Sequence, residues 1–479
     1  MILIGYISSL LYGMLCLLLS FIAYKFGLSK IYSRKIVHIL VGFEWMILYH
    51  TMGVGLNFVV VCLLFTLLLI ISYRKKMFSM ISSESDNAPG TVYYGVSMTV
   101  MAILSIVLDG FIFAFGIAVF CTSFGDGLAG VVGSVIKKCN PKIYNNKTLF
   151  GTIAAVLFCF ASVMALSWIY ELEISVFAVL MISLFAAGLE LIATKGLDNI
   201  TLPIGVSVLT YLFLYAPQIQ NYIVPIVLTP YIIAIVLSKK LLTNKGVVAA
   251  VVLDVAVSVA LANFGFVLLL SFLMLSVIID KMKKHYKKTE ESVSEKGEER
   301  DEIQVMANGL APMIMAVLYL ITNDFVFVIG YAVSIAEAFS DTAASGFGVF
   351  SKKAFDPFKM REVPKGLSGG MSIIGTISSV VMPFILLLIA VFFGKISIYE
   401  WILCSAFAFI GAFTDSFLGS VIQAKFKCKF CGKITERREH CTKKTELICG
   451  VRTITNDAVN LISSLFAAIS AMAFWSFML

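Results

Sequence analysis

The chain has 479 residues, of which 59% are hydrophobic, and a mean hydropathy of +0.95. This composition excludes a water-soluble globular protein and is typical of an integral membrane protein with many spanning helices. The formal net charge is +8, so the positions of the basic residues need an explanation of their own.

About sixteen segments approach the length of roughly 20 apolar residues that a spanning helix needs. The predicted spans are 2–24, 36–50, 54–73, 91–109, 111–133, 149–170, 174–194, 202–216, 222–238, 246–262, 264–280, 304–322, 325–348, 369–394, 398–422 and 457–478. The first has no basic n-region and no small-residue cleavage site, so we interpret it as a retained helix. The predicted fold class is all-α, a polytopic membrane protein.

The basic residues predict the orientation of these helices. If the helices alternate in direction, every Lys and Arg except Lys395 lies on one side of the membrane. By the positive-inside rule that side is cytoplasmic, and both termini lie outside. The positive charge is then a consequence of topology and requires no nucleic-acid partner, although it can attract anionic headgroups or nucleotides.

Two stretches of the chain resemble each other. Residues 124–133 read FGDGLAGVVG and residues 339–348 read FSDTAASGFG, and each places an aspartate, Asp126 or Asp341, in an apolar helix of small residues. Ionised carboxylates are costly in hydrocarbon and usually mark function. We therefore predict two parallel, diverged halves of about eight helices each, 1–240 and 241–479. A charged linker is expected at 281–303 and a Cys/His-rich cytoplasmic loop at 425–452.

Further polar residues recur in the same order in both halves. Lys147, Thr148 and Gly151 open one predicted helix, and Lys365, Gly369 and Gly370 open its counterpart. The remaining pairs are Glu190 with Asp415, and Asp198-Asn199 with Asn456-Asp457. All of them fall at the predicted cytoplasmic ends of their helices.

This set of residue types suits a nucleotide with a divalent metal. Carboxylates and Asn can hold Mg²⁺, which bridges phosphate oxygens. Glycines at helix N-termini let backbone N–H groups approach phosphates, and Lys adds a positive charge. Gly125, Gly127 and Gly130 are counted with the expected phosphate-binding residues. The alternatives are a helix-packing role for Asp126 and Asp341, close helix packing for Gly127, Ala129, Gly130 and Gly133, and a topological role for Lys147.

Arg34, Lys35 and His38 open the second predicted span at the same surface. His38 lies one helical turn from Arg34 and shares its face. We expect these residues to contribute to phosphate binding; the alternative is a basic flank whose side chains reach toward the membrane surface.

The loop at 425–452 has the spacing of a metal site. Cys428 and Cys431 are followed by His440 and Cys441, which supplies the four Cys or His ligands of tetrahedral Zn²⁺. Cys449 is a competing fourth ligand, and a set of reduced cytosolic thiols is the alternative. A disulfide framework is not expected in a cytoplasmic loop.

The first half resembles the integral-membrane phytol and dolichol kinases, which are related to the lipid cytidylyltransferases. The resemblance rests on SRKIVHI at 33–39, GTVYY at 90–94, GDGLAGVVG at 125–133, KTLFGT at 147–152, Glu190 and DNITLP at 198–203. It implies a nucleotide-dependent kinase, typically using CTP, that acts on a long isoprenoid alcohol.

The second half is similar to the membrane family that includes phytyl-phosphate kinase. The similarity rests on LTNKGVVAA at 242–250, Gln304, Asn308, SDTAAS at 340–345, GLSGGMSIIGT at 366–376, TDSFLGS at 414–420 and TNDAVNLISS at 455–464. It implies conversion of an isoprenyl monophosphate to a diphosphate. The chain departs from that family's pattern after Ser345, where Gly346 stands in place of Glu. Glu337, one turn before Asp341, is the candidate to replace that acid.

These features together predict a bifunctional membrane kinase that phosphorylates an isoprenoid alcohol twice. Asp126, Glu190, Asp341 and Asp415 are the expected catalytic acids, with Mg²⁺ and CTP as cofactor and phosphoryl donor and a membrane lipid as substrate. The active sites are expected to face the cytoplasm. A lipid cytidylyltransferase and a lipid transporter built on parallel repeats remain as alternatives.

Overall fold

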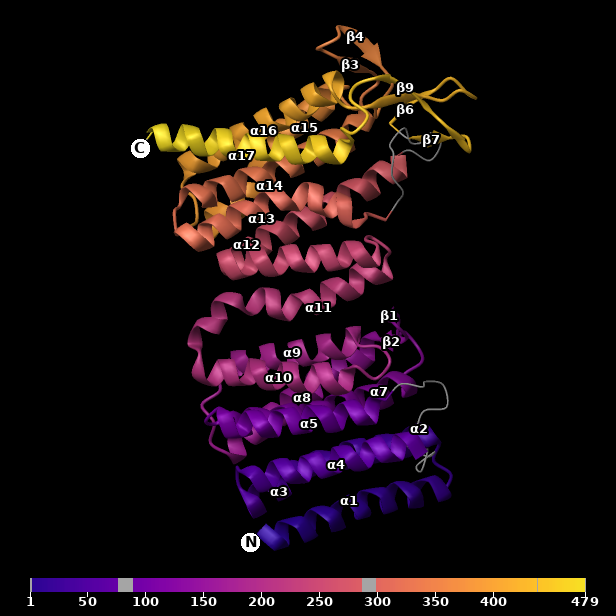
Figure 1. The fold of residues 1–479 in the computed structure, drawn as a ribbon, viewed down its shortest axis with the longest axis vertical. Coiled ribbons are helices and arrows are strands. Elements are labelled where there is room, and N and C mark those ends of the chain that lie inside the picture. Colours follow the sequence, from indigo (N-terminus) through magenta and orange to yellow (C-terminus); the bar gives the residue numbers. More distant parts are fainter. Residues whose placement is uncertain (1, 76–88, 287–298, 437, 479) are drawn as a thin grey trace. The chain divides into compact units, whose positions relative to one another are not determined.

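The computed structural model describes residues 2–75, 89–286, 299–436 and 438–478 (Figure 1). The chain divides into two compact units, Met1–Lys239 (unit 1) and Lys240–Leu479 (unit 2). Thirteen helical segments of the described chain are long and apolar enough to cross a membrane. The all-α polytopic membrane fold predicted from composition is therefore confirmed.

The count of about sixteen spans stays a prediction, and three places account for the difference. The predicted span 36–50 is divided between α2 and α3, and α9 has only 17 residues. The two spans predicted at 246–262 and 264–280 form α12, which is interrupted at Ala262 by non-helical backbone with φ of 55°.

Unit 1 is a bundle of helices with one short hairpin. Its helices are α1 (Ile2–Lys25), α2 (Lys30–Leu40), η1 (Val41–Phe43), α3 (Glu44–Met52), α4 (Leu56–Lys75), α5 (Gly90–Val107), α6 (Phe111–Phe120), η2 (Cys121–Asp126), α7 (Gly127–Val135), α8 (Leu149–Ile169), α9 (Val176–Ile192), α10 (Asp198–Tyr215), η3 (Pro217–Tyr222) and α11 (Ile223–Ser238). The antiparallel hairpin of β1 (Lys142–Tyr144) and β2 (Lys147–Thr148) connects α7 to α8.

Unit 2 combines spanning helices with short strands. Its helices are α12 (Asn244–Tyr286), α13 (Glu302–Thr322), α14 (Val326–Phe347), η4 (Gly348–Phe350), α15 (Ile373–Phe392), α16 (Ile398–Val421) and α17 (Asn456–Met478). Its strands are β3 (Ala354–Asp356), β4 (Arg361–Val363), β5 (Lys425–Lys427), β6 (Ile434–Thr435), β7 (Glu439–His440), β8 (Lys443–Lys444) and β9 (Glu446–Cys449). β3 pairs with β4, β7 pairs with β8, and β6-β5-β9 form a three-stranded sheet. In Figure 1 these strands gather at one end of the helices of unit 2.

The predicted linker at 281–303 is partly helical. Residues 281–286 complete α12, and Glu302 and Ile303 begin α13, because Asp301 caps that helix by accepting a hydrogen bond from Gln304 N. Residues 287–298 lie outside the described part of the chain.

Each unit is organised around one central helix. In the apolar 18-residue stretch of Phe111–Val135, which is α6, η2 and α7 in sequence, 83% is buried, and in that of Val326–Phe350 78% is buried, whereas the corresponding share in the other long spans is 11–44%. Helices that are apolar on all sides are the ones a bundle can enclose. Asp126 lies on the first central segment and Asp341 on the second, so both polar residues stand inside their units.

Candidate functional sites

Asp126 forms the centre of a charged cluster in unit 1. Its Oδ2 atom lies 3.0 Å from Lys35 Nζ and 3.2 Å from His38 Nε2, and both side chains come from α2. Lys35 also donates to the Asp126 carbonyl oxygen at 3.0 Å, and His38 Nε2 lies 3.1 Å from the carbonyl oxygen of Thr122. Lys35 and His38 therefore hold one carboxylate within the central segment, where η2 ends and α7 begins.

The backbone that carries Asp126 is a π-helical turn, η2. Such turns are rare and occur frequently at functional sites. The sequence predicted a plain helix here, because hydrophobic periodicity does not reveal an i→i+5 turn.

A second charged pair stands beside the first. Lys147, on β2, donates a hydrogen bond to Glu190 near the end of α9. Burial alone would lower the pKa of Lys147, but the carboxylates of Glu190, Asp126 and Asp198 together raise it above its ordinary value. The structure thus brings three predicted acids within electrostatic range of one lysine.

The small residues of α7 permit this arrangement. A Cβ atom on Gly130 would lie 3.1 Å from Lys35 Cε, and one on Gly127 would lie 2.8 Å from an Ile39 side-chain carbon. A Cβ on Gly125 would lie 2.4 Å from Cys159 Sγ. These glycines therefore permit close packing around the charged cluster, which was the alternative interpretation of Gly127 and Gly130; phosphate binding by the glycines stays a prediction.

The start of α8 lies against α7 in the same region. Thr148 caps α8 by accepting a hydrogen bond from Gly151 N at 3.3 Å. A Cβ on Gly151 would lie 3.3 Å from the Ala129 carbonyl oxygen and 3.5 Å from Gly133 Cα. Lys147 is placed beside the acids because β2 leads directly into this tightly packed helix start.

The other predicted residues of unit 1 lie at its edge. Asp198 begins α10, and its Oδ1 atom accepts hydrogen bonds from Asn199 N at 3.0 Å and from Asn199 Nδ2 at 2.9 Å. Arg34 is half-buried and makes no ion pair with the described residues. It is therefore the member of the predicted basic set that the cluster does not include.

Unit 2 repeats the helix contact found in unit 1. Ser372 caps α15 by accepting from Gly375 N at 3.2 Å, and a Cβ on Gly375 would lie 2.8 Å from the Ala344 carbonyl oxygen and 3.4 Å from Gly348 Cα. Ala344 and Gly348 follow Asp341 at the spacing with which Ala129 and Gly133 follow Asp126. These matched contacts support the predicted repeat.

The same contacts correct the predicted pairing of Lys147 with Lys365. The helix of unit 2 begins at Ile373 with Ser372 as its cap, so the residue in the place of Lys147 is Met371. Lys365, Gly369 and Gly370 lie in the preceding turn and do not open the helix. Lys365 makes no ion pair within the described ranges. The sequence comparison matched two Lys-Xaa-Leu strings, whereas the packing matches the two capping residues.

The acids of unit 2 lie among hydroxyl and amide groups. Glu337, on α14, accepts a hydrogen bond from Ser464, and Asp415, on α16, accepts one from Ser463 at 3.3 Å. Asp341 lies within electrostatic range of both Asp415 and, on α12, Lys283. The described residues contain no ion pair to Glu337, Asp341 or Asp415.

Three side-chain amides extend this cluster. The Asn460 amide lies 3.3 Å from Asp415 Oδ2 and 3.3 Å from Asn308 Oδ1, and Asn456 Nδ2 lies 3.3 Å from the same amide. With its nitrogen toward Asp415, Asn460 donates to that carboxylate and, at 2.9 Å, to the Asn456 carbonyl oxygen. In the opposite orientation it donates to Asn308 Oδ1 and accepts from Asn456 Nδ2 instead. Asn460 was not among the predicted site residues, although it follows Asn456 by one helical turn, the spacing that places two side chains on one face.

Two other predicted residues have local roles. Gln304 completes the capping box of α13, and Ser345 is exposed and donates to the Thr342 carbonyl oxygen of its own helix at 3.1 Å. Asp457 lies in the first turn of α17. The structure places neither Gln304 nor Ser345 in contact with the acids.

Ser368, which sequence reasoning missed, is held from several sides. Its backbone N–H donates to Glu436 at 2.8 Å, and its carbonyl oxygen accepts from Lys425 at 2.7 Å. Its hydroxyl donates to Asn456 at 3.2 Å and accepts from Gln423 at 3.1 Å. The turn at 366–370 is thereby fixed to the start of α17.

The four predicted metal ligands do come together. The ligand atoms of Cys428, Cys431, His440 and Cys441 all lie within 4.8 Å of one another, and His440 Nδ1 lies 3.4 Å from Cys431 Sγ and 3.2 Å from Cys441 Sγ. Tetrahedral Zn²⁺ with bonds of about 2.0–2.3 Å separates its ligand atoms by about 3.3–3.8 Å. Hydrogen bonds from the backbone, chiefly from Cys431, lower the pKa of the Cys428 thiol to about 6, which favours the metal-binding thiolate.

Cys449, the competing ligand, lies on β9 opposite Lys425 and is not part of the group. The donor set therefore fits one structural zinc ion held by the first four residues.

The chain matches the family described as integral membrane protein DUF92 over residues 227–468. It belongs to this family. The match begins within α11, which packs in unit 1 through a hydrogen bond from Tyr231 to the Leu184 carbonyl oxygen. The family boundary therefore precedes the boundary between the two compact units.

Three curated proteins are similar to parts of the chain. The chain is 31% identical over 203 residues to an uncharacterised membrane protein of Methanocaldococcus jannaschii, which is 40% of this chain and 80% of the relative. It is 27% identical over 188 residues to phytol kinase of Synechocystis, which is 37% of this chain and 78% of that enzyme. It is 23% identical over 244 residues to protein VTE6, chloroplastic, of Arabidopsis thaliana, 50% of this chain and 66% of the relative. No solved structure matches the chain at a significant level.

Proposed function

We propose that the chain is a bifunctional membrane kinase that phosphorylates an isoprenoid alcohol to its monophosphate in unit 1 and to its diphosphate in unit 2. A nucleoside triphosphate, CTP, is the donor. The observation that carries the proposal is the cluster of Lys35, His38, Asp126, Lys147 and Glu190 around the junction of η2 and α7. The likeness to phytol kinase supports this substrate class.

In unit 1 the cluster supplies the groups that phosphoryl transfer requires. The alcohol oxygen attacks the γ-phosphorus, the bond from that phosphorus to the bridging oxygen breaks, and the nucleoside diphosphate leaves. Asp126 is the proposed acceptor of the hydroxyl proton, and Lys147 stabilises the phosphate charge. Catalysis of this kind is mostly positioning and charge neutralisation.

In unit 2 the acceptor is itself an anionic phosphate, and the surroundings of the acids differ accordingly. Met371 replaces the lysine of unit 1, and Glu337 Oε1 is buried without a hydrogen-bond partner in the described chain. A buried carboxylate oxygen without a partner fits a bound cation. Glu337, Asp341 and Asp415 are the residues that would hold Mg²⁺, which would bring two anionic phosphates together.

The experiment is a product analysis with purified full-length protein in detergent. The protein is given Mg²⁺, CTP or ATP, and a panel of isoprenoid alcohols and monophosphates, and the lipid products are identified by mass. The proposal expects monophosphate from alcohol and diphosphate from monophosphate. A cytidylylated lipid, or unchanged lipid under all conditions, would contradict it.

A further inference from the structure

Two buried charged side chains of the Cys/His-rich loop hold both backbone polar groups of Ser368. Glu436 accepts a hydrogen bond from Ser368 N at 2.8 Å, and Lys425 Nζ donates to the Ser368 carbonyl oxygen at 2.7 Å. The exposed fraction is 7% for Glu436 and 3% for Lys425. Burying a charged group is costly unless it is hydrogen-bonded, so two such groups directed at one residue require an explanation.

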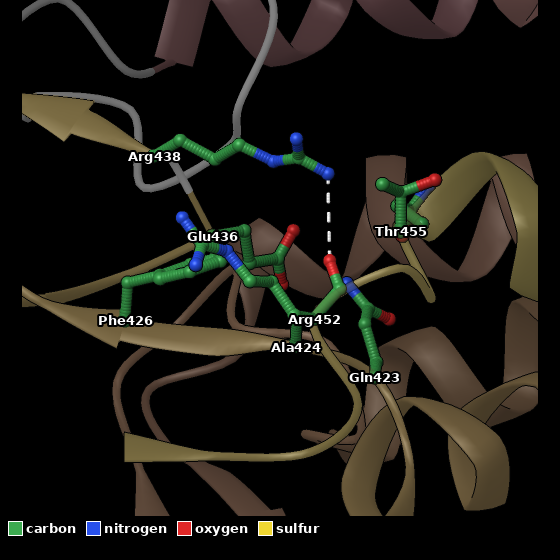
Figure 2. A pocket seen from close by; sticks show the side chains of 8 residues that line it. Gln423, Ala424, Phe426, Glu436, Arg438, Arg452 and Thr455 are labelled. Carbon is green, nitrogen blue, oxygen red and sulfur yellow. Dashed lines mark hydrogen bonds between the residues drawn. The ribbon is translucent and has the colours of Figure 1, made fainter. Parts of the chain in front are cut away.

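The turn at 366–370 needs partners of this kind, because it belongs to no helix or strand. Gly366 and Gly369 both have φ of +83°, and backbone N–H and C=O groups outside regular structure must be satisfied from elsewhere. Figure 2 shows Glu436 and Gln423 in this region, where the loop meets the start of α17. Gln423 Nε2 adds a third contact by donating to Ser368 Oγ at 3.1 Å.

Glu436 and Lys425 stand at the open end of one hairpin, and two predicted metal ligands stand at its tip. Lys425 begins β5, and Glu436 directly follows β6, which pairs with β5. Cys428 follows β5 and Cys431 precedes β6, and Gly432 N donates to the Cys428 carbonyl oxygen at 3.0 Å to close the tip. The positions of Glu436 and Lys425 therefore depend on the geometry of the hairpin.

This hairpin is too short to be rigid by itself. Its strands are three and two residues long, and two-stranded hairpins in isolation are marginally stable. The other two ligands, His440 and Cys441, come from the hairpin of β7 and β8. A metal ion that joins all four would fix one hairpin to the other and restrict where Glu436 and Lys425 can lie.

The turn leads directly to the acids of unit 2. Ser368 Oγ donates to Asn456 at 3.2 Å. The Asn460 amide lies 3.3 Å from Asn456 Nδ2 and 3.3 Å from Asp415 Oδ2. A Cβ atom on Gly369 would lie 2.6 Å from the backbone of α16, the helix that carries Asp415. The turn thus contacts both helices whose side chains meet at this carboxylate.

We propose that the Cys/His-rich loop is a metal-dependent clamp on the second active site, in which Glu436 and Lys425 position the turn at 366–370. With metal bound, the clamp holds Asn456 and the side chains around Asp415 in place. Without metal, the hairpin loosens and the turn is released. Both residues are positioning residues that act through Ser368. Their effect on catalysis rests on the proposed function, whereas the clamp itself rests on the contacts of Ser368.

The first measurement is hydrogen exchange of the turn, followed by mass spectrometry on full-length protein in detergent. Glu436→Ala should speed exchange of the Ser368 amide about tenfold, the effect of losing one charge-assisted hydrogen bond. Glu436→Gln keeps an acceptor and should retain most of the protection. Glu446→Ala, at an exposed position of the same sheet, is the matched control. Exchange in Glu436→Ala at the rate of this control would show the inference to be wrong.

The second measurement removes the metal. Cys431→Ser should lower the metal content found by elemental analysis and should speed exchange in the turn, whereas Cys449→Ser should change neither. Loss of metal with unchanged exchange would mean that the loop holds the turn without the metal, against the inference.

Product analysis connects the clamp with the second phosphorylation. Glu436→Ala and Lys425→Ala should lower kcat for supplied monophosphate about tenfold, with a smaller change in KM, and should leave alcohol phosphorylation unchanged. Glu436→Gln should recover most of the second step. Lys427→Ala, at an exposed position of the same strand, is the control for Lys425→Ala.

The failures of the clamp and of the proposed function are distinguishable. A released turn with an unchanged second step would contradict the positioning role, and equal losses in both steps would indicate general destabilisation instead. If the turn depends on metal and on Glu436 but the wild-type protein phosphorylates no lipid, the clamp stands and the proposed function fails.

Discussion

Lys35 Nζ lies 3.0 Å from Asp126 Oδ2 and 3.0 Å from the carbonyl oxygen of the same residue. One lysine thus fixes both the side chain and the backbone at the last residue of the π-helical turn. Gly130 makes room for the lysine stem, because a Cβ atom there would lie 3.1 Å from Lys35 Cε. The Lys35–Asp126 ion pair, the π-helical turn and Gly130 therefore depend on one another.

Lys147 should keep its charge throughout the working pH range. Its folded-state pKa is raised above the ordinary value of about 10.4, so the charge is complete below that pH and is lost only above it. Lys147→Gln should raise the KM for the nucleotide about tenfold, and Lys142→Gln, on exposed β1, should not.

The wild-type KM profile checks the pH argument. Between pH 7 and 9 the KM of the wild type for the nucleotide should not rise in a way that Lys147→Arg abolishes. Such a rise, titrating within that range, would mean that the Lys147 ammonium is not held by the three carboxylates.

Glu337 should be required for the second phosphorylation and not for the first. Glu337→Gln removes the negative charge but retains a side chain that can accept from Ser464. Diphosphate formation from monophosphate should fall about a hundredfold or more, the range for loss of an electrostatic catalytic group. Ser345→Ala, at an exposed position on the same helix, is the control. Equal losses in both phosphorylation steps would indicate a structural role instead.

The sequence predicted the all-α membrane fold because hydrophobic segments of spanning length are visible without any tertiary information. It also singled out Asp126, Glu190 and the four residues of the Cys/His loop, since charged residues in apolar helices and Cys-x2-Cys spacing stand out locally. The structure places Asp126 beside Lys35 and His38, Glu190 beside Lys147, and the four loop residues together. Their roles stay predictions.

The sequence did not predict correctly which residues of the two halves correspond where that correspondence depends on packing. Lys365 resembles Lys147 in its local string, but the contact of Gly375 with Gly348 places Met371 in that position. Ser368 and Gln423 also escaped prediction, because their importance comes from contacts across some 55 to 88 residues of chain. Neither residue type nor spacing signals such contacts.

Gly369 and Gly366 test the turn that precedes α15. Both have φ of +83°, but a Cβ on Gly369 would lie 2.6 Å from Ser420 N, whereas nothing lies within 4 Å of one on Gly366. Gly366→Ala should cost about 1–2 kcal/mol from the backbone conformation alone, and Gly369→Ala about 1–3 kcal/mol more from the clash. Thermal unfolding in detergent measures the difference. Equal loss in both variants would mean that the turn does not pack against α16 as described.

The Cys/His loop should hold one zinc ion per chain. Elemental analysis of the purified protein should find it, and Cys428→Ser should remove it while Cys449→Ser retains it. A chelator should lower the thermal stability of the wild type and of Cys449→Ser, because metal binding stabilises the folded loop. Zinc retained by Cys428→Ser but lost from Cys449→Ser would assign the site to a different ligand set.

The most direct test of two successive active sites is product analysis of Asp126→Asn and Asp415→Asn, with Asp109→Asn, at an exposed position of unit 1, as control. Asp126→Asn should form no monophosphate from alcohol yet convert supplied monophosphate to diphosphate at the wild-type rate. Asp415→Asn should do the reverse and accumulate monophosphate. Alcohol phosphorylation by Asp126→Asn at the rate of the control would contradict the account.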